Sequence, residues 1–126
     1  MRIIYKAIDK PMEVIETTER ALLLCANNHI DGYKEYVYLN NNLVMVADED
    51  GLLKDLPLNF YHLKEGIYPE KIVGDVIIAN AKYDTNICDY AIEDLTENQI
   101  KYCNIIFGSE KQTQIKQMYQ LFNFEI

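Results

Sequence analysis

The sequence predicts an α+β fold: a mostly antiparallel β-sheet of about five to six strands, covered by a short N-terminal helix and two C-terminal amphipathic helices. Apolar runs rich in Ile, Val and Tyr, each bounded by a turn signal, predict the strands. Helical periodicity in the last third of the chain predicts the helices. The densest apolar run, KIVGDVIIANA at residues 71–81, predicts a buried central strand, in which Gly74 indicates a bulge or a close backbone approach.

A chain of 126 residues is long enough to bury a self-sufficient core. Its apolar content of 49% is ordinary for a globular protein and argues against general disorder. No internal repeat, low-complexity tract or linker is visible, so we expect one compact α+β domain over residues 1–126. Because the sequence shows neither a signal peptide nor an apolar stretch near the ~20 residues that a membrane span needs, we expect a cytoplasmic protein.

The N-terminal half should contain two pairs of strands and one short helix. Residues 1–8 and 12–16 are expected to form strands that meet at a turn containing Pro11. A helix is expected over residues 21–26, ALLLCA, after a threonine cap and before the Asn-Asn pair that should end it. Residues 33–39 then alternate in polarity and should pair with residues 43–47 across an Asn-Asn-Asn turn.

The middle of the chain is expected to be less regular. An acidic turn at residues 48–51 should close the second hairpin, and residues 52–56 could add a shorter strand or extended segment. Residues 59–70, NFYHLKEGIYPE, are predicted to be irregular because they contain a Gly, a Pro and no clear alternation. We favour a buried lid for this aromatic-rich segment over a binding loop. Residues 82–89 are polar and are expected to form a loop.

The C-terminal third predicts two amphipathic helices that meet at a Gly-Ser corner. Thr96 and Gln99 have the spacing of a capping box, and apolar residues then recur at helical spacing. Gly108 should end this helix in a left-handed conformation. Ser109 and Gln112 repeat the capping signature before a second apolar stripe.

Charge and cysteine content limit the possible partners. Twenty acidic and twelve basic residues give a net charge of −8 and a pI near 4.7, which disfavours direct binding to DNA or RNA. The ordinary consequence of this charge is solubility; the more specific alternative is an acidic face that mimics nucleic acid for a basic partner protein. Cys25, Cys88 and Cys103 show no Cys-x-x-Cys spacing, so we expect a reducing compartment without a disulfide framework.

Catalytic and metal chemistry find no support in the sequence. The five glycines form no phosphate-binding loop, and the one serine, Ser109, is better explained as a helix cap. Cys25 and His29 are four residues apart, but the intervening Asn-Asn pair separates them. Residues 46–57 resemble a calcium loop only superficially, because Val and Pro stand where oxygen ligands are required. We therefore expect no enzyme, no catalytic or metal-ligating residue and no cofactor.

Tyrosines and one aromatic-rich segment are the best candidates for a binding site. Lys34, Tyr36 and Tyr38 alternate along one predicted strand and should share a face that could stack a base or anchor a partner. The structural alternative is that this face lies under a helix. The segment that begins at residue 59 supplies four more candidates, Asn59, Phe60, Tyr61 and His62.

Several of these features together resemble a known family. They are PMEV at residues 11–14, IDGY at 30–33, the acidic turn at 48–51, LPLN at 56–59, IVGD at 72–75 and Leu95-Thr96 at a helix start. In this combination the chain is similar, over roughly residues 1–102, to a domain-of-unknown-function family of small phage, plasmid and mobile-element proteins of Gram-positive bacteria. The shared motifs are structural, so the resemblance supplies no catalytic residues.

The resemblance implies a genomic setting in which small proteins often bind components of host immunity. It therefore implies a non-enzymatic antagonist of bacterial antiviral defence that works by stoichiometric binding in the host cytoplasm. In the favoured form, a homo-oligomer sequesters a nucleotide-derived immune signal, with aromatic residues stacking the base. In the alternative, an acidic face blocks the basic groove of a defence protein, as an anti-CRISPR-like mimic of nucleic acid would.

Overall fold

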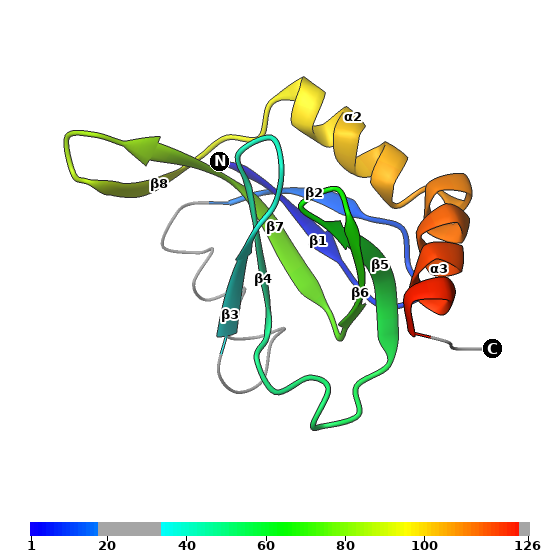
Figure 1. The fold of residues 1–126 in the computed structure, drawn as a ribbon. Helices are drawn as coiled ribbons and strands as arrows, with labels where there is room; N and C mark the ends of the chain where they lie inside the picture. The colour runs from blue at the N-terminus through cyan, green and yellow to red at the C-terminus, as the bar shows by residue number, and fades with distance from the viewer. Residues whose placement is uncertain (18–33, 124–126) are drawn as a thin grey trace.

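The computed structural model describes residues 1–17 and 34–123, which form two antiparallel β-sheets and two C-terminal helices (Figure 1). The main sheet has the strand order β2-β1-β7-β4-β3, and β8 pairs with β7 beside this path. The second sheet is the hairpin of β5 and β6. The bounds of the elements are β1 Arg2–Lys6, β2 Glu13–Glu16, β3 Lys34–Tyr38, β4 Leu43–Asp48, β5 Leu58–Lys64, β6 Tyr68–Val73, β7 Val76–Asp84, β8 Asp89–Glu93, α2 Glu97–Ile106 and α3 Ser109–Asn123.

The α+β class and the mostly antiparallel sheet are confirmed. Both predicted strand pairs of the N-terminal half form, as β1 with β2 and as β3 with β4. The helix expected over residues 21–26 lies outside the described residues, as do Cys25 and His29, and both described helices are C-terminal.

The predicted central strand is divided at Gly74, and its two parts belong to different sheets. Strand β6 ends at Val73 and β7 begins at Val76. Gly74 has a φ of +76°, which L-residues rarely adopt, and a Cβ atom there would lie 2.9 Å from Leu56 Cδ1. The glycine therefore marks a close approach, as predicted, but it turns the chain out of one sheet and into the other.

Strand β7 is the centre of the main sheet. It pairs with β1 through Val76–Ile78 on one side and with β4 through Ile77–Asn80 on the other. Both faces of this strand are buried, because Ile77 and Ile78 point to opposite faces and are both 0% exposed. The face that contains Ile78 packs against β5, β6 and α2, through residues that include Phe60, Ile72 and Cys103.

Two segments predicted to be irregular are β-hairpins. Residues 59–70 form most of β5 and β6, whose turn uses positive φ at Glu65 (55°) and Gly66 (71°). The prediction was wrong because Gly66 serves the turn, and Pro69 lies in β6, a strand that pairs only with β5 among the described elements, where a missing N–H is tolerated. Residues 82–89 are likewise no loop, since β7 continues to Asp84 and turns back into β8. In contrast, residues 52–56 form consecutive hydrogen-bonded turns and no strand.

The capping box of α2 is confirmed, whereas the corner after it differs from the prediction. Thr96 Oγ1 accepts from Gln99 N, and Gln99 Oε1 accepts from Thr96 N. Gly108 does not adopt the left-handed conformation, and the C-cap of α2 is Phe107 with a φ of −84°. Gln112 does not complete a second capping box, because its side chain bonds Tyr61 in β5.

The two described cysteines are both free thiols: Cys88 is exposed and Cys103 is buried in the core. Burial raises the pKa of the Cys103 thiol to about 11. Neither described helix is long and apolar enough to span a membrane.

Candidate functional site

The predicted site residues fall into two groups on opposite faces of the main sheet. In the antiparallel register, Tyr36 lies opposite Val46 and Tyr38 opposite Val44, so both rings share the face of these valines. They are 53% and 56% exposed. Lys34 begins the same strand, opposite Asp48. Phe60 packs against the other face, the one that contains Met45 and Ile78. The structure therefore does not bring the tyrosines of β3 together with the aromatic residues of β5.

The β5 group serves packing in this structure. Phe60 is 4% exposed and meets the Phe107 ring edge-on at 4.7 Å between centroids. Tyr61 is 7% exposed and its ring lies 5.6 Å from that of Tyr119. Both rings are covered in this structure, Phe60 in the core beside Phe107 at the end of α2 and Tyr61 by Tyr119 of α3.

The polar neighbours of these rings are also engaged. The Asn59 amide donates to Lys6 O and Gly74 O at 2.8 Å, and its oxygen accepts from Lys6 Nζ at 2.9 Å. Asn59 thus joins β1 to the junction of the two sheets. His62 Nδ1 lies 2.8 Å from Glu70 Oε1, across the β5–β6 pair.

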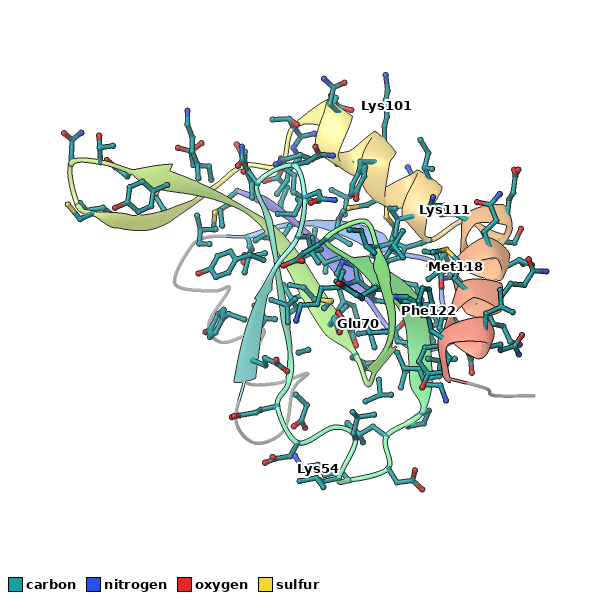
Figure 2. The ribbon with its side chains drawn as sticks, viewed as in Figure 1. Lys54, Glu70, Lys101, Lys111, Met118 and Phe122 are labelled. Atoms are coloured by element: carbon teal, nitrogen blue, oxygen red, sulfur yellow. The ribbon has the colours of Figure 1, made fainter. Side chains whose placement is uncertain are left out.

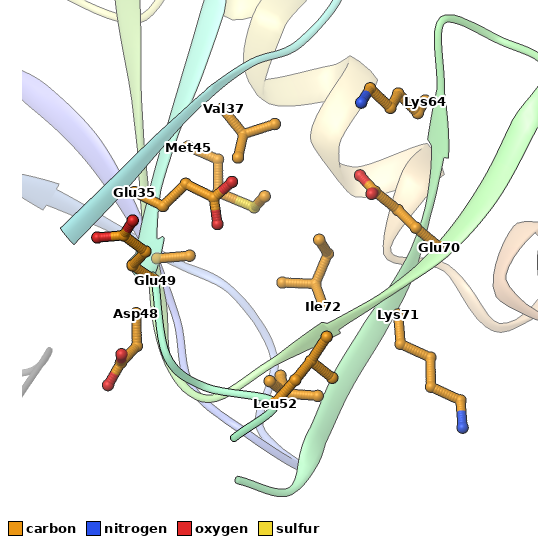
Figure 3. A pocket seen from close by; sticks show the side chains of 12 residues that line it. Glu35, Val37, Met45, Asp48, Glu49, Leu52, Lys64, Glu70, Lys71 and Ile72 are labelled. Atoms are coloured by element: carbon orange, nitrogen blue, oxygen red, sulfur yellow. The ribbon is translucent and has the colours of Figure 1, made fainter. Parts of the chain in front are cut away.

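A cleft of about 250 Å³ opens where the two sheets diverge (Figure 3). One wall comes from β3 and β4, and the other from β6 and the end of β5. Its apolar lining includes Val37, Met45 and Ile72. Val37 and Met45 are cross-strand partners, so they place an apolar floor on the face that the hairpin covers.

Carboxylates continue this floor toward the end of the sheet. Glu35 lies opposite Ala47 and so follows the apolar row on the same face, and Glu49 in the turn after β4 also lines the cleft. Figure 3 shows both carboxylates on the β3–β4 wall and that of Glu70 on the facing wall. Among the ion pairs of the described residues, none includes Glu35 or Glu49.

The mouth of the cleft is bounded by residues 49–57, which we call the leucine loop. Leu52 and Leu53 are 72% and 88% exposed, and Leu52 lines the cleft. The loop also carries the acidic side chains of Glu49, Asp50 and Asp55. Together the two leucines form a small exposed apolar patch with acidic neighbours.

The leucine loop is held firmly at its base. Asp48, of which 5% of the side chain is exposed, accepts from Lys54 Nζ at 2.7 Å and from Asp50 N at 2.9 Å. Burial alone would raise the pKa of Asp48, but the Lys54 and Asp50 hydrogen bonds and the charge of Lys54 outweigh it, so this pKa is lowered. Gly51 packs tightly against Val73, where an added Cβ would lie 2.8 Å from a methyl carbon.

This arrangement is suited to holding a cationic or amphipathic group. Among the described residues, no group of three or more His, Cys, Asp or Glu side chains is placed to bind a metal. Sequence reasoning missed the cleft, since it dismissed residues 46–57 once the calcium pattern failed. The adjacent Leu52 and Leu53 within an acidic loop were the available signal.

Comparison with known proteins identifies a family but no activity. Residues 1–104 match the model of a family described as Domain of unknown function (DUF3846). No curated protein and no solved structure matches the chain.

Proposed function

The chain belongs to the DUF3846 family, a domain of unknown function, and we propose that it acts without catalysis, as a stoichiometric antagonist of bacterial antiviral immunity that docks its acidic end on a basic groove of a defence protein. The observation that carries the proposal is the leucine loop, which presents Leu52 and Leu53 beside the carboxylates of Glu49, Asp50 and Asp55. We further propose a phage, plasmid or mobile-element origin in Gram-positive bacteria.

The physical basis is a combination of apolar contact and charge. Leucines that are already exposed need no rearrangement to enter a partner's pocket, which limits the ordering cost of binding. The surrounding carboxylates would favour a partner with basic residues and would repel nucleic acid, in line with the net charge of −8. Docking on a basic groove would also displace the nucleic acid that such a groove holds.

Sequestration of a nucleotide-derived signal by a homo-oligomer is the second candidate. Its remaining support is the exposed pair Tyr36 and Tyr38, because Phe60 and Tyr61 are buried. A ligand at a hundred times its Kd should stabilise the protein by about 2.7 kcal/mol. A thermal-shift panel of cyclic nucleotides therefore separates the two candidates: stabilisation by one of them would favour sequestration, and no shift would favour the protein partner.

The proposed function can be tested by infection. The protein is expressed in a bacterial host with defined restriction, CRISPR or nucleotide-signalling defences, and phage plaques are counted. We expect plaque counts to rise with one defence system, and the Leu52→Ser/Leu53→Ser variant to lose this effect. Leu121→Ser is the matched control, because Leu121 is 78% exposed but lies on α3.

Both variants are first checked for native thermal unfolding, since neither removes a buried side chain. A wild-type protein that relieves none of the defences would contradict the proposal. So would a double leucine variant that is as active as the wild type.

A further inference from the structure

We propose that the cleft between β3–β4 and β6 binds an arginine side chain of the protein partner. This inference rests on the proposed function and names the chemistry that its binding surface recognises. It starts from the shape of the cleft, which combines an apolar floor with acidic ends (Figure 3).

The floor matches the stem of a long basic side chain. Val37, Met45 and Ile72 line the cleft from both sheets, and Leu52 stands at its mouth. Arg and Lys commonly lay their methylene groups on apolar surface while the charged end reaches a polar partner. A volume of about 250 Å³ leaves room for such a side chain between the walls.

The charge arrangement calls for a cation that is planar and has several donors. Glu35 lies on β3 and Glu49 directly follows the last residue of β4, and Figure 3 shows both carboxylates on the same wall of the cleft. Two like charges on one wall repel, and among the described residues no ion pair includes either of them. A guanidinium has five N–H donors in one plane and can bond both carboxylates at once, whereas an ammonium is a compact point charge.

The other charged groups around the cleft leave this position available. Lys54 is bonded to Asp48. Lys71 points away from the cleft in Figure 3, and its Nζ lies 5.0 Å from the centroid of the Tyr119 ring. Glu70 on the facing wall is bonded to His62. Lys64 lines the cleft on the β5–β6 side, away from Glu35 and Glu49.

The test is an NMR titration of the full-length ¹⁵N-labelled protein with three blocked tripeptides. They carry arginine, lysine or the neutral arginine analogue citrulline between two glycines. We expect saturable shifts of the Glu35, Ala47, Glu49 and Ile72 amides, with binding strongest for arginine, weaker for lysine and absent for citrulline. The Glu35→Gln/Glu49→Gln variant should bind the arginine peptide at least about tenfold more weakly, the loss expected when charge-assisted hydrogen bonds are removed.

The matched control is Glu13→Gln/Glu110→Gln, which removes the same net charge from two exposed positions on β2 and α3. Equal weakening in this control would show that only the overall field attracts the peptide and would overturn the inference. Equal shifts with citrulline, or shifts outside the cleft, would overturn it too.

The infection assay distinguishes failure of the inference from failure of the proposed function. If the arginine peptide binds in the cleft but no defence is relieved, the function fails and the arginine site stands. If a defence is relieved through Leu52 and Leu53 while the peptide does not bind, the function stands and the arginine site is overturned.

Discussion

Asp48 shows how a single buried charge can organise a functional surface. It is the last residue of β4, and its carboxylate fixes both the Asp50 backbone and the Lys54 side chain. A buried carboxylate is costly unless it is paired and hydrogen-bonded, and here both conditions are met. The same contacts hold the leucine loop in place, so the pair couples stability to the presentation of Leu52 and Leu53.

Replacing Asp48 by Asn should lower the free energy of unfolding at pH 7 by about 1–3 kcal/mol, the usual cost of losing charged hydrogen bonds at a buried group. Because the pKa of Asp48 is lowered in the folded protein, the ionised pair contributes fully above its ordinary value of 3.8, and the contribution is lost as the pH falls through the folded pKa. The difference between wild type and Asp48→Asn should therefore shrink below pH 3.8.

Urea unfolding from pH 7 to pH 3 measures this effect. Asp55→Asn is the control in the same loop, since Asp55 is exposed and belongs to none of the described ion pairs. A gap between wild type and Asp48→Asn that stays constant over the whole range would show that the carboxylate charge is not what stabilises the loop.

At the scale of elements, one side-chain amide contributes the hydrogen bonds that join helix α3 to the second sheet, beside the ring contacts of Tyr119. Gln112 Oε1 accepts from Tyr61 N at 2.7 Å, and Gln112 Nε2 donates to Tyr61 O at 2.9 Å and to Ile106 O at 2.7 Å. The amide thus satisfies the outward backbone groups of Tyr61 much as another strand would. It also protects part of β5 from pairing with another chain.

Gln112→Met keeps the length of the side chain but removes these three hydrogen bonds. We expect a loss of about 2 kcal/mol in unfolding free energy, because the buried Tyr61 backbone groups lose their partners. Hydrogen exchange should show faster opening at Tyr61, while β7 stays protected. Gln114→Met is the control on the exposed side of α3; equal acceleration there would contradict the role assigned to Gln112.

The sequence predicted elements whose signals are local. The capping box at Thr96 and Gln99 and the alternation of Tyr36 and Tyr38 act within a few residues, and both formed as expected. Gln112 carried the same local signature but bonds Tyr61, which is 51 residues away in the chain. That partner exists only once the hairpin has docked, so its contact could not be predicted from spacing.

The same limit applied to the candidate site. Phe60 and Tyr61 were predicted to be possible ligand contacts because aromatic residues near a Gly and a Pro suggested a loop. Their burial depends on α2 and α3, which follow much later in the chain. The cleft needs the fold of both sheets, since Val37 and Ile72 belong to different ones.

On the scale of the whole molecule, the division of one apolar run into two sheets creates the site. Strands β6 and β7 leave Gly74 in different directions (Figure 1). The cleft is lined by residues of both sheets, among them Val37 and Ile72. Side chains drawn on the full ribbon show charged groups over much of the surface, including Lys54 in the leucine loop and Lys101 and Lys111 on the helices (Figure 2). Lys101 and Lys111 lie away from the cleft, whose own lining contains four carboxylates, Glu35, Asp48, Glu49 and Glu70, and two lysines, Lys64 and Lys71.

Repulsion among the acidic residues should slightly lower the free energy of unfolding, while the same charges favour a basic partner. Raising the salt concentration from about 0.01 M to about 0.15 M shortens the screening length from about 30 Å to about 8 Å. Since the net charge is −8, we expect this change to raise the Tm by a few degrees, because self-repulsion is screened. A fall in Tm would instead mean that attraction between opposite charges dominates the folded state.

The same repulsion should lower the free energy of unfolding locally, at the two glutamates of the cleft. Glu35→Gln/Glu49→Gln should stabilise the protein at low salt by a few tenths of a kcal/mol more than Glu13→Gln/Glu110→Gln, because the first variant removes two like charges from one wall of the cleft, whereas Glu110 lies in the first turn of α3, where a negative charge is favourable. The excess should diminish at high salt, where the repulsion is already screened. Thermal unfolding of the two variants at both salt concentrations measures it, and equal stabilisation would show that Glu35 and Glu49 do not repel each other. Since the same carboxylates are proposed to bind arginine, a variant that is more stable and yet binds the arginine peptide more weakly would indicate that folding stability is given up there for recognition.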